Sequence, residues 1–164
     1  MTKLFMCLTF LVLGAACGKG FKQDDSESSS RANQESDSYS INQQYISLVN
    51  EYRIRKKLTP LSNQVIIEEA AEAHSKGMAL HTRPFGHYGF SLRCRRLNNR
   101  LGSTKACGEV VAKGHKSAKE VLNAWLKSPI HRQHIEASYY THTGLGVHKD
   151  SNGEMYWTQI FVEL

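Results

Sequence analysis

The stretch GLGVHKDSNGEMYWTQIFV, residues 144–162, decides the fold. Asn152 and Gly153 form a turn signal between two segments rich in apolar residues, which predicts a β-hairpin. The second segment, YWTQIFV at 156–162, is almost wholly apolar, as expected for a central strand that is covered on both faces. The sequence therefore predicts a buried sheet with helices packed on it.

Several helical segments precede this hairpin. The capping box from Ser40 to Gln43, followed by apolar residues spaced four, three and four apart, predicts a helix over 40–57. A second helix is predicted over 63–80, where small residues on the apolar face indicate close packing. The Arg-rich segment 91–101 is interpreted as a third, shorter helix. A second capping box begins at Ser117 and predicts a fourth helix.

Ser128 and Pro129 end the fourth helix and begin another helical turn, because Ser is a preferred N-cap and Pro is tolerated at the first helical position. This places His131 in a first turn. Helices that come before a buried, mainly antiparallel sheet predict an α/β fold, a three-layer α-β-α sandwich.

The first 39 residues are predicted to lie outside this domain, which occupies 40–164. Residues 1–16 combine an early lysine, a short apolar run and small residues, which is typical of a secretory signal peptide. The run is too short for a permanent membrane span, which needs about 20 residues. Cys17 follows as in a bacterial lipobox, in which the cysteine is lipidated; the alternative is a plain cleaved signal with an incidental cysteine. Residues 17–39 are rich in Ser, Asp, Glu and Gln and predict a disordered tether.

Cys94 and Cys107 remain in the domain. An even pair in an exported protein most simply forms a disulfide. A zinc site is the weaker interpretation, because neither residue belongs to a Cys-x-x-Cys pair.

The formal net charge of +6 is concentrated in basic residues between 83 and 105, whereas the tether is acidic. Such a patch fits anionic envelope polymers or lipid head groups, and it equally fits a solvated basic face. Nucleic acid is not an expected partner, since the chain has no recognisable reading motif. We expect a monomer.

Five segments in this order resemble the bacterial branch of the CAP superfamily, named for cysteine-rich secretory proteins, antigen 5 and plant pathogenesis-related proteins. They are LVNEYR at 48–53, FGH at 85–87, CGE at 107–109, WLKSPIHR at 125–132, and GLGV at 144–147 with YWTQ at 156–159. The resemblance implies a cleft in which two histidines and two acidic residues converge, and in several members the histidines bind zinc or another divalent ion.

The family motifs assign three site residues in this chain. His87 matches the first histidine, and His131 matches the second histidine. Glu109 matches the glutamate of the family's Gly-Glu-Asn motif. Two departures weaken the match. Ser128 stands where many eukaryotic members have glutamate, and Val110 replaces the usual asparagine.

Two neutral imidazoles with water or one carboxylate oxygen would form an open zinc site. The positive end of a helix would keep the ring of His131 neutral, while Glu109 would orient a ring or accept a proton. Other histidines are interpreted as surface or packing residues, and His81 is a rival to His87. The remaining five are His74, His115, His134, His142 and His148.

Two alternative functions are consistent with these features. The first is a non-enzymatic module that binds a lipid, a small ligand, a peptide or an anionic envelope polymer. The second is a metal-assisted hydrolase of peptide or envelope polymer, with His87 and His131 holding the ion and Glu109 as base. The chain has no His-Glu-x-x-His helix and no Gly-x-Ser-x-Gly elbow, which favours binding.

Overall fold

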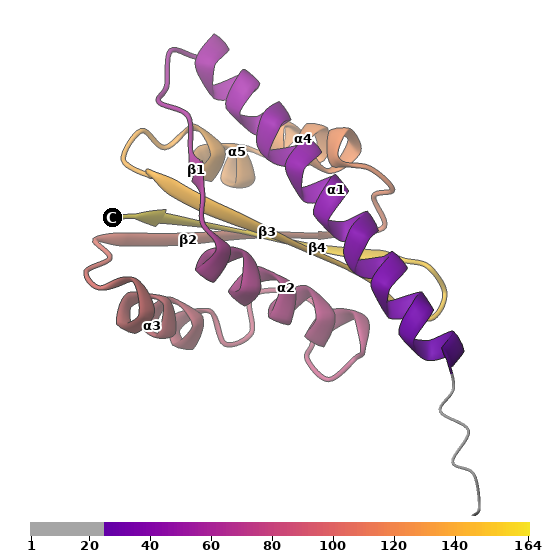
Figure 1. The fold of residues 1–164 in the computed structure, drawn as a ribbon. Helices are drawn as coiled ribbons and strands as arrows, with labels where there is room; N and C mark the ends of the chain where they lie inside the picture. Colours follow the sequence, from indigo (N-terminus) through magenta and orange to yellow (C-terminus); the bar gives the residue numbers. More distant parts are fainter. Residues whose placement is uncertain (1–24) are drawn as a thin grey trace, which may run out of the picture.

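The structure, a computed structural model, describes residues 25–164 in backbone and the side chains from Ser40 onward. Nine helices and strands follow one another in these residues (Figure 1). They are α1 (Asp25–Arg55), β1 (Ser62–Asn63), α2 (Val65–Ala79), α3 (Phe90–Leu101), β2 (Ala106–Lys113), α4 (Ala118–Lys127), α5 (Pro129–Glu136), β3 (His142–Lys149) and β4 (Met155–Glu163).

The sheet has the strand order β1-β3-β4-β2, so β2 lies at an edge and β4 lies inside. The pairs β3 with β4 and β2 with β4 are antiparallel, while the short β1 runs parallel to β3. Every residue of β4 from Met155 to Val162 is buried, which confirms the prediction of a central strand covered on both faces. The hairpin prediction is also confirmed, because β3 and β4 pair directly across the Asn152-Gly153 turn.

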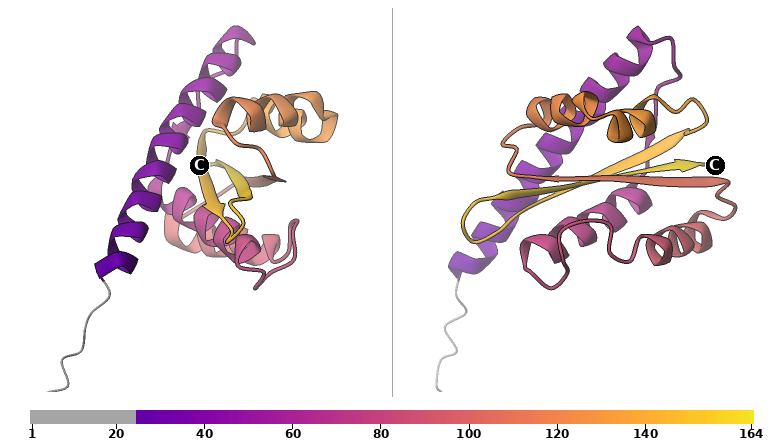
Figure 2. Two further views of the ribbon diagram at one scale, coloured as in Figure 1. Left: turned by 90° about the vertical axis from the view of Figure 1, so that its right-hand side faces the viewer. Right: turned by 180° about the vertical axis from the view of Figure 1, so that it is seen from behind.

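Helices cover both faces of this sheet. In the right-hand view of Figure 2, α4 and α5 lie above the sheet and α2 and α3 lie below it. One core cluster joins Tyr45 of α1 and Trp125 of α4 to the sheet, and another joins Ile67 of α2 and Leu97 of α3 to Ile160. The predicted three-layer α-β-α sandwich is therefore confirmed.

Two glycines of β3 allow α2 to pack directly against the strand. A Cβ atom on Gly144 would lie 2.6 Å from the carbonyl carbon of Ile67 and 2.7 Å from Cα of Glu68. A Cβ on Gly146 would likewise lie under 3.0 Å from backbone atoms of α2. The GLG segment thus sets the distance between the helix layer and the sheet.

The predicted start of the first helix at Ser40 is wrong. Helix α1 begins at Asp25, so the backbone of 25–39, expected to be a disordered tether, is helical. This segment contains neither Gly nor Pro. Because adding a residue to an existing helix is much easier than nucleating one, the packed turns around Tyr45 and Val49 extend toward the N-terminus.

The other helix predictions agree with the structure within a few residues. Ser117 caps α4, since its Oγ accepts a hydrogen bond from the backbone N–H of Glu120 at 3.2 Å. Strand β1 was not predicted, because two residues carry no periodicity. Between Asp25 and Leu164, no helix combines the length and the apolar character needed to cross a membrane. The predicted signal peptide and the lipidation site Cys17 lie outside the described residues.

Candidate functional site

The site is built on the edge strand β2, where Glu109 points toward α3. Its side chain is only 1% exposed. Two guanidinium nitrogens of Arg93 in α3 hold the carboxylate: Nε donates to Oε2 at 2.8 Å and Nη2 donates to Oε1 at 2.8 Å. A buried carboxylate needs such a partner, because an isolated charge is very costly to remove from water.

His87 lies in the loop between α2 and α3 and adds a third contact to the same carboxylate. Its Nδ1 is 2.9 Å from Oε1 of Glu109, and its side chain is 51% exposed. A carboxylate can only accept, so Nδ1 carries the proton and donates it. The other ring nitrogen, Nε2, is then left with its lone pair. This is the arrangement in which a carboxylate orients a histidine for a ligand.

The opposite wall of the site comes from α5, beyond the other face of β2. Gly108 precedes Glu109 and faces α5, because successive residues of a strand point to opposite faces. A Cβ on Gly108 would lie 2.7 Å from Nδ1 of His134 and would also collide with the hydroxyl of Tyr140. The glycine therefore lets the ring of His134 lie against the strand.

These walls enclose a hollow of about 230 Å³, called here the histidine cleft. Its lining residues are His87, Phe90, Cys107, Gly108, Glu109 and His134. His131 is not among them, although it lies one turn earlier on α5. His134 is a packing residue, as predicted, because its ring stacks on Tyr140 and Phe161, and it also lines the cleft. The spacing of three between His131 and His134 was the one sequence signal for it.

The three imidazoles influence one another electrostatically. Burial lowers the pKa of His131, and the nearby His87 lowers it further. Burial also lowers the pKa of His134, with additional contributions from His131 and His87. The lowered pKa values keep the two α5 rings neutral near pH 7.

His74 of α2 supports the cleft from below. It is fully buried, and its Nε2 lies 2.8 Å from the carbonyl oxygen of Gly86, next to His87. Burial lowers its pKa, and the Arg93 guanidinium adds to this effect. His74 is therefore a packing residue, as predicted. His81, the rival to His87, is exposed against Tyr156 and does not line the cleft.

The side chains around the cleft limit the kind of metal site that it can form. Among the described residues, no three or more His, Cys, Asp or Glu side chains are arranged to hold an ion. Both oxygens of Glu109 already accept hydrogen bonds from Arg93. Ser128, at the position of the second acidic residue, is the N-cap of α5. What fits is an open site of imidazole nitrogens; a site that needs a free carboxylate does not fit.

The disulfide between Cys94 and Cys107 confirms the predicted pairing. It joins α3 to β2 with a Cα–Cα distance of 6.1 Å. Cys94 follows Arg93 and Cys107 lies two residues before Glu109, so the covalent link sits beside the ion pair. The link holds the two elements of the pair together.

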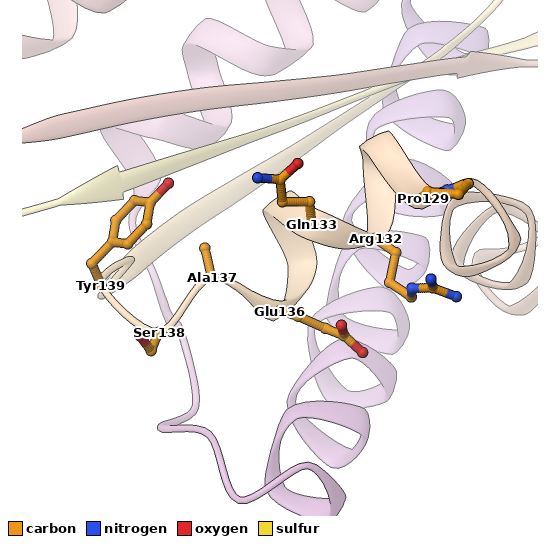
Figure 3. Close-up of a pocket in the computed structure, with 7 residues that line it drawn as sticks. All are labelled: Pro129, Arg132, Gln133, Glu136, Ala137, Ser138 and Tyr139. Atoms are coloured by element: carbon orange, nitrogen blue, oxygen red, sulfur yellow. The ribbon is translucent and has the colours of Figure 1, made fainter.

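A larger, shallow hollow of about 470 Å³ lies along α5 and the loop after it (Figure 3). Its side chains do not converge: Gln133 and Tyr139 point toward the sheet, whereas Arg132 and Glu136 point toward the opposite side. Glu136 accepts a hydrogen bond from Tyr52 and pairs with Lys56 at 3.4 Å. These contacts fasten α5 to α1, and we assign the hollow no ligand.

Solved structures share this fold. An extracellular protein from Bacillus anthracis that contains an SCP domain superposes with a TM-score of 0.70 and 26% identity, over 80% of this chain and 43% of that one. An outer surface protein from Borrelia burgdorferi superposes with a TM-score of 0.64 and 21% identity, over 72% of this chain and 88% of that one.

Sequence comparison leads to the same family. The uncharacterized protein YkwD of Bacillus subtilis is 32% identical over 122 residues, which are 71% of this chain and 45% of YkwD. The chain thus spans less than half of that relative and of the Bacillus anthracis protein. Residues 46–161 match the family model described as CAP, the cysteine-rich secretory protein family. This chain belongs to the CAP family.

Proposed function

We propose that this chain is an exported CAP-domain protein that acts as a non-enzymatic binding module, with the histidine cleft as its ligand site. One observation carries the choice of binding over catalysis. A general base must reach a substrate proton, and the Glu109 side chain is only 1% exposed, with both oxygens already accepting hydrogen bonds from Arg93 or His87. Removing Arg93 from the carboxylate would leave a buried charge without a partner.

The cleft is suited to a divalent ion of the zinc class. His87 offers Nε2 while Glu109 fixes its ring, and His131, which does not itself line the cleft, would supply a second neutral imidazole from α5. His134 flanks them from the next turn of α5. With two nitrogen ligands and water, such an ion would keep an open position for a small ligand or for a group on a partner.

Zinc titration of the purified chain by calorimetry tests this proposal. We expect His87→Ala/His131→Ala, which removes both nitrogen ligands, to weaken zinc binding by at least about tenfold, or about 1.4 kcal/mol. The matched control is His81→Ala/His115→Ala, which removes two imidazoles that the proposed site does not use, and we expect it to leave the affinity unchanged. Equal zinc affinity in the wild type and the cleft variant would overturn the proposal.

The hydrolase alternative is tested with the same proteins. Turnover of casein or peptidoglycan by the wild type that disappears in the cleft variant, while the control variant stays active, would establish catalysis. We expect no turnover above the level of the cleft variant.

Export and anchoring belong to the same proposal. The relatives are described as an extracellular protein and as an outer surface protein, and the first residues of this chain have the pattern of a signal peptide. We expect Cys17 to be lipidated and to hold the domain at a membrane, where a lipid, a small ligand or an anionic envelope polymer is within its reach. Mass spectrometry of the mature N-terminus decides this, because an unmodified Cys17 excludes the anchor.

A further inference from the structure

A second hollow, distinct from the histidine cleft, lies between α2 and α3. It has a volume of about 210 Å³ and is called here the arginine groove. Four arginine side chains line it: Arg83, Arg93, Arg96 and Arg100. Its other lining residues are Glu69 and the apolar Ala70, Ala73 and Leu97.

The groove holds more positive charge than its acidic partners neutralise. Arg93 is paired with Glu109 beneath it, and Arg100 pairs with Glu69 at 2.8 Å. Within the part of the chain that the structure describes, Arg83 and Arg96 have no acidic partner. Like charges that share a partly enclosed space repel each other, and this repulsion is relieved by an anion.

Arg83 is held in place by the helix that it crosses. Its backbone N–H donates to the carbonyl oxygen of Gly77 at 3.0 Å. A Cβ on Gly77 would lie 2.9 Å from Cδ and 3.1 Å from Nε of Arg83, so the arginine stem lies directly on the backbone of α2. A side chain ordered in this way loses less conformational entropy when it binds a ligand.

We propose that the arginine groove binds a phosphate ester, with Arg83 and Arg96 holding the phosphate oxygens. The planar guanidinium group donates paired hydrogen bonds that match a phosphate. Arg100 is half-exposed, as is its partner Glu69, so it can turn to the same ligand at little cost. The apolar Ala70 and Ala73 would contact the carbon chain beside the phosphate, and the volume of about 210 Å³ admits a chain of about the size of glycerol.

Two sources carry this chemistry: a soluble glycerol phosphate, and the head group of an anionic phospholipid. The test measures both with the full chain at about 0.15 M salt, where long-range attraction is screened. Calorimetry follows sn-glycerol 3-phosphate, and co-sedimentation follows vesicles of phosphatidylglycerol, with vesicles of zwitterionic phosphatidylcholine as the reference without net charge.

The decisive variant is Arg83→Gln/Arg96→Gln. Its matched control, Arg95→Gln/Lys105→Gln, removes the same net charge from exposed residues outside the groove. We expect the groove variant to lose at least about tenfold in affinity and the control less than about twofold, because charge-assisted hydrogen bonds to phosphate are among the stronger polar contacts.

Gly77→Ala gives an independent test that keeps every arginine. The new methyl group displaces Arg83 from the backbone of α2, so the affinity falls although the net charge is unchanged. If the groove variant loses affinity for glycerol phosphate, the soluble ester is the ligand. If it loses affinity only for phosphatidylglycerol vesicles, the ligand is the lipid head group. Equal losses in the two double variants, or no binding to either probe, would overturn the proposal.

Discussion

The contact between α2 and β3 makes Gly144→Ala a severe test of the fold. The added Cβ would lie 2.6 Å and 2.7 Å from two backbone atoms of α2, whereas ordinary contacts begin at about 3.4 Å. Backbone atoms cannot rotate away, so helix and strand must separate by roughly 1 Å. Inserting a methyl group into a well-packed core costs about 1–3 kcal/mol, and here the separation also loosens Ile67 and Ala71 in the core. We therefore expect a loss of about 3 kcal/mol or more.

Urea denaturation followed by circular dichroism measures this loss as a lower midpoint with an unchanged slope. Gly77→Ala is the matched control, because its new Cβ meets only the flexible Arg83 side chain and alanine favours a helix interior by up to about 1 kcal/mol. We expect the control to be as stable as the wild type or slightly more stable. A Gly144→Ala protein within about 1 kcal/mol of the wild type would refute the close-packing argument.

Three further predictions concern the site. Glu109→Gln leaves the Arg93 guanidinium buried without its counterion and should cost about 3–5 kcal/mol in urea denaturation; a neutral effect would contradict the ion pair. Because burial lowers the folded-state pKa of His74, stability is fully present above about pH 6.5 and falls as the pH drops below that value. Between pH 7.5 and 5.5 the free energy of unfolding, measured by urea denaturation, should fall less steeply for His74→Gln than for the wild type, by up to about 1.4 kcal/mol per pH unit, and parallel slopes would contradict this. Replacing Cys94 and Cys107 by serine should cost about 3 kcal/mol for a sequence separation of 13, measured by thermal unfolding against wild type with and without reductant.

The fold was predictable because its strongest signals are local. The hairpin turn, the apolar run of β4 and the serine cap of α4 each depend on neighbouring residues, and each is present in the structure. The start of α1 was not predictable in the same way. A capping box describes how a helix can begin, but the same residues are compatible with a helix interior when the turns after them are packed.

The site was predictable only as far as the family motifs reach. His87 and Glu109 were identified from those motifs, and the structure brings them into contact. The role of Arg93 could not be predicted from a motif, because its contact with Glu109 depends on how α3 packs on β2. The position of His134 in the lining of the cleft could not be predicted for a related reason. It enters the cleft only because the residue opposite it is Gly108, and that pairing exists only in the folded chain.

Arg93 connects the two hollows, which raises the question of whether a ligand in one alters the other. It lines the arginine groove and at the same time holds Glu109 of the histidine cleft. A phosphate that drew Arg93 away would leave the buried carboxylate unpaired, at a cost of about 3–5 kcal/mol, which exceeds the gain from one further hydrogen bond of about 1.5–3 kcal/mol. The groove ligand must therefore bind through Arg83 and Arg96 while Arg93 stays on Glu109. Zinc affinity should then be the same with and without saturating glycerol phosphate, after correction for zinc bound by the phosphate itself. A change of more than about threefold would mean that Arg93 moves, and the assignment of the groove to the other two arginines would be wrong.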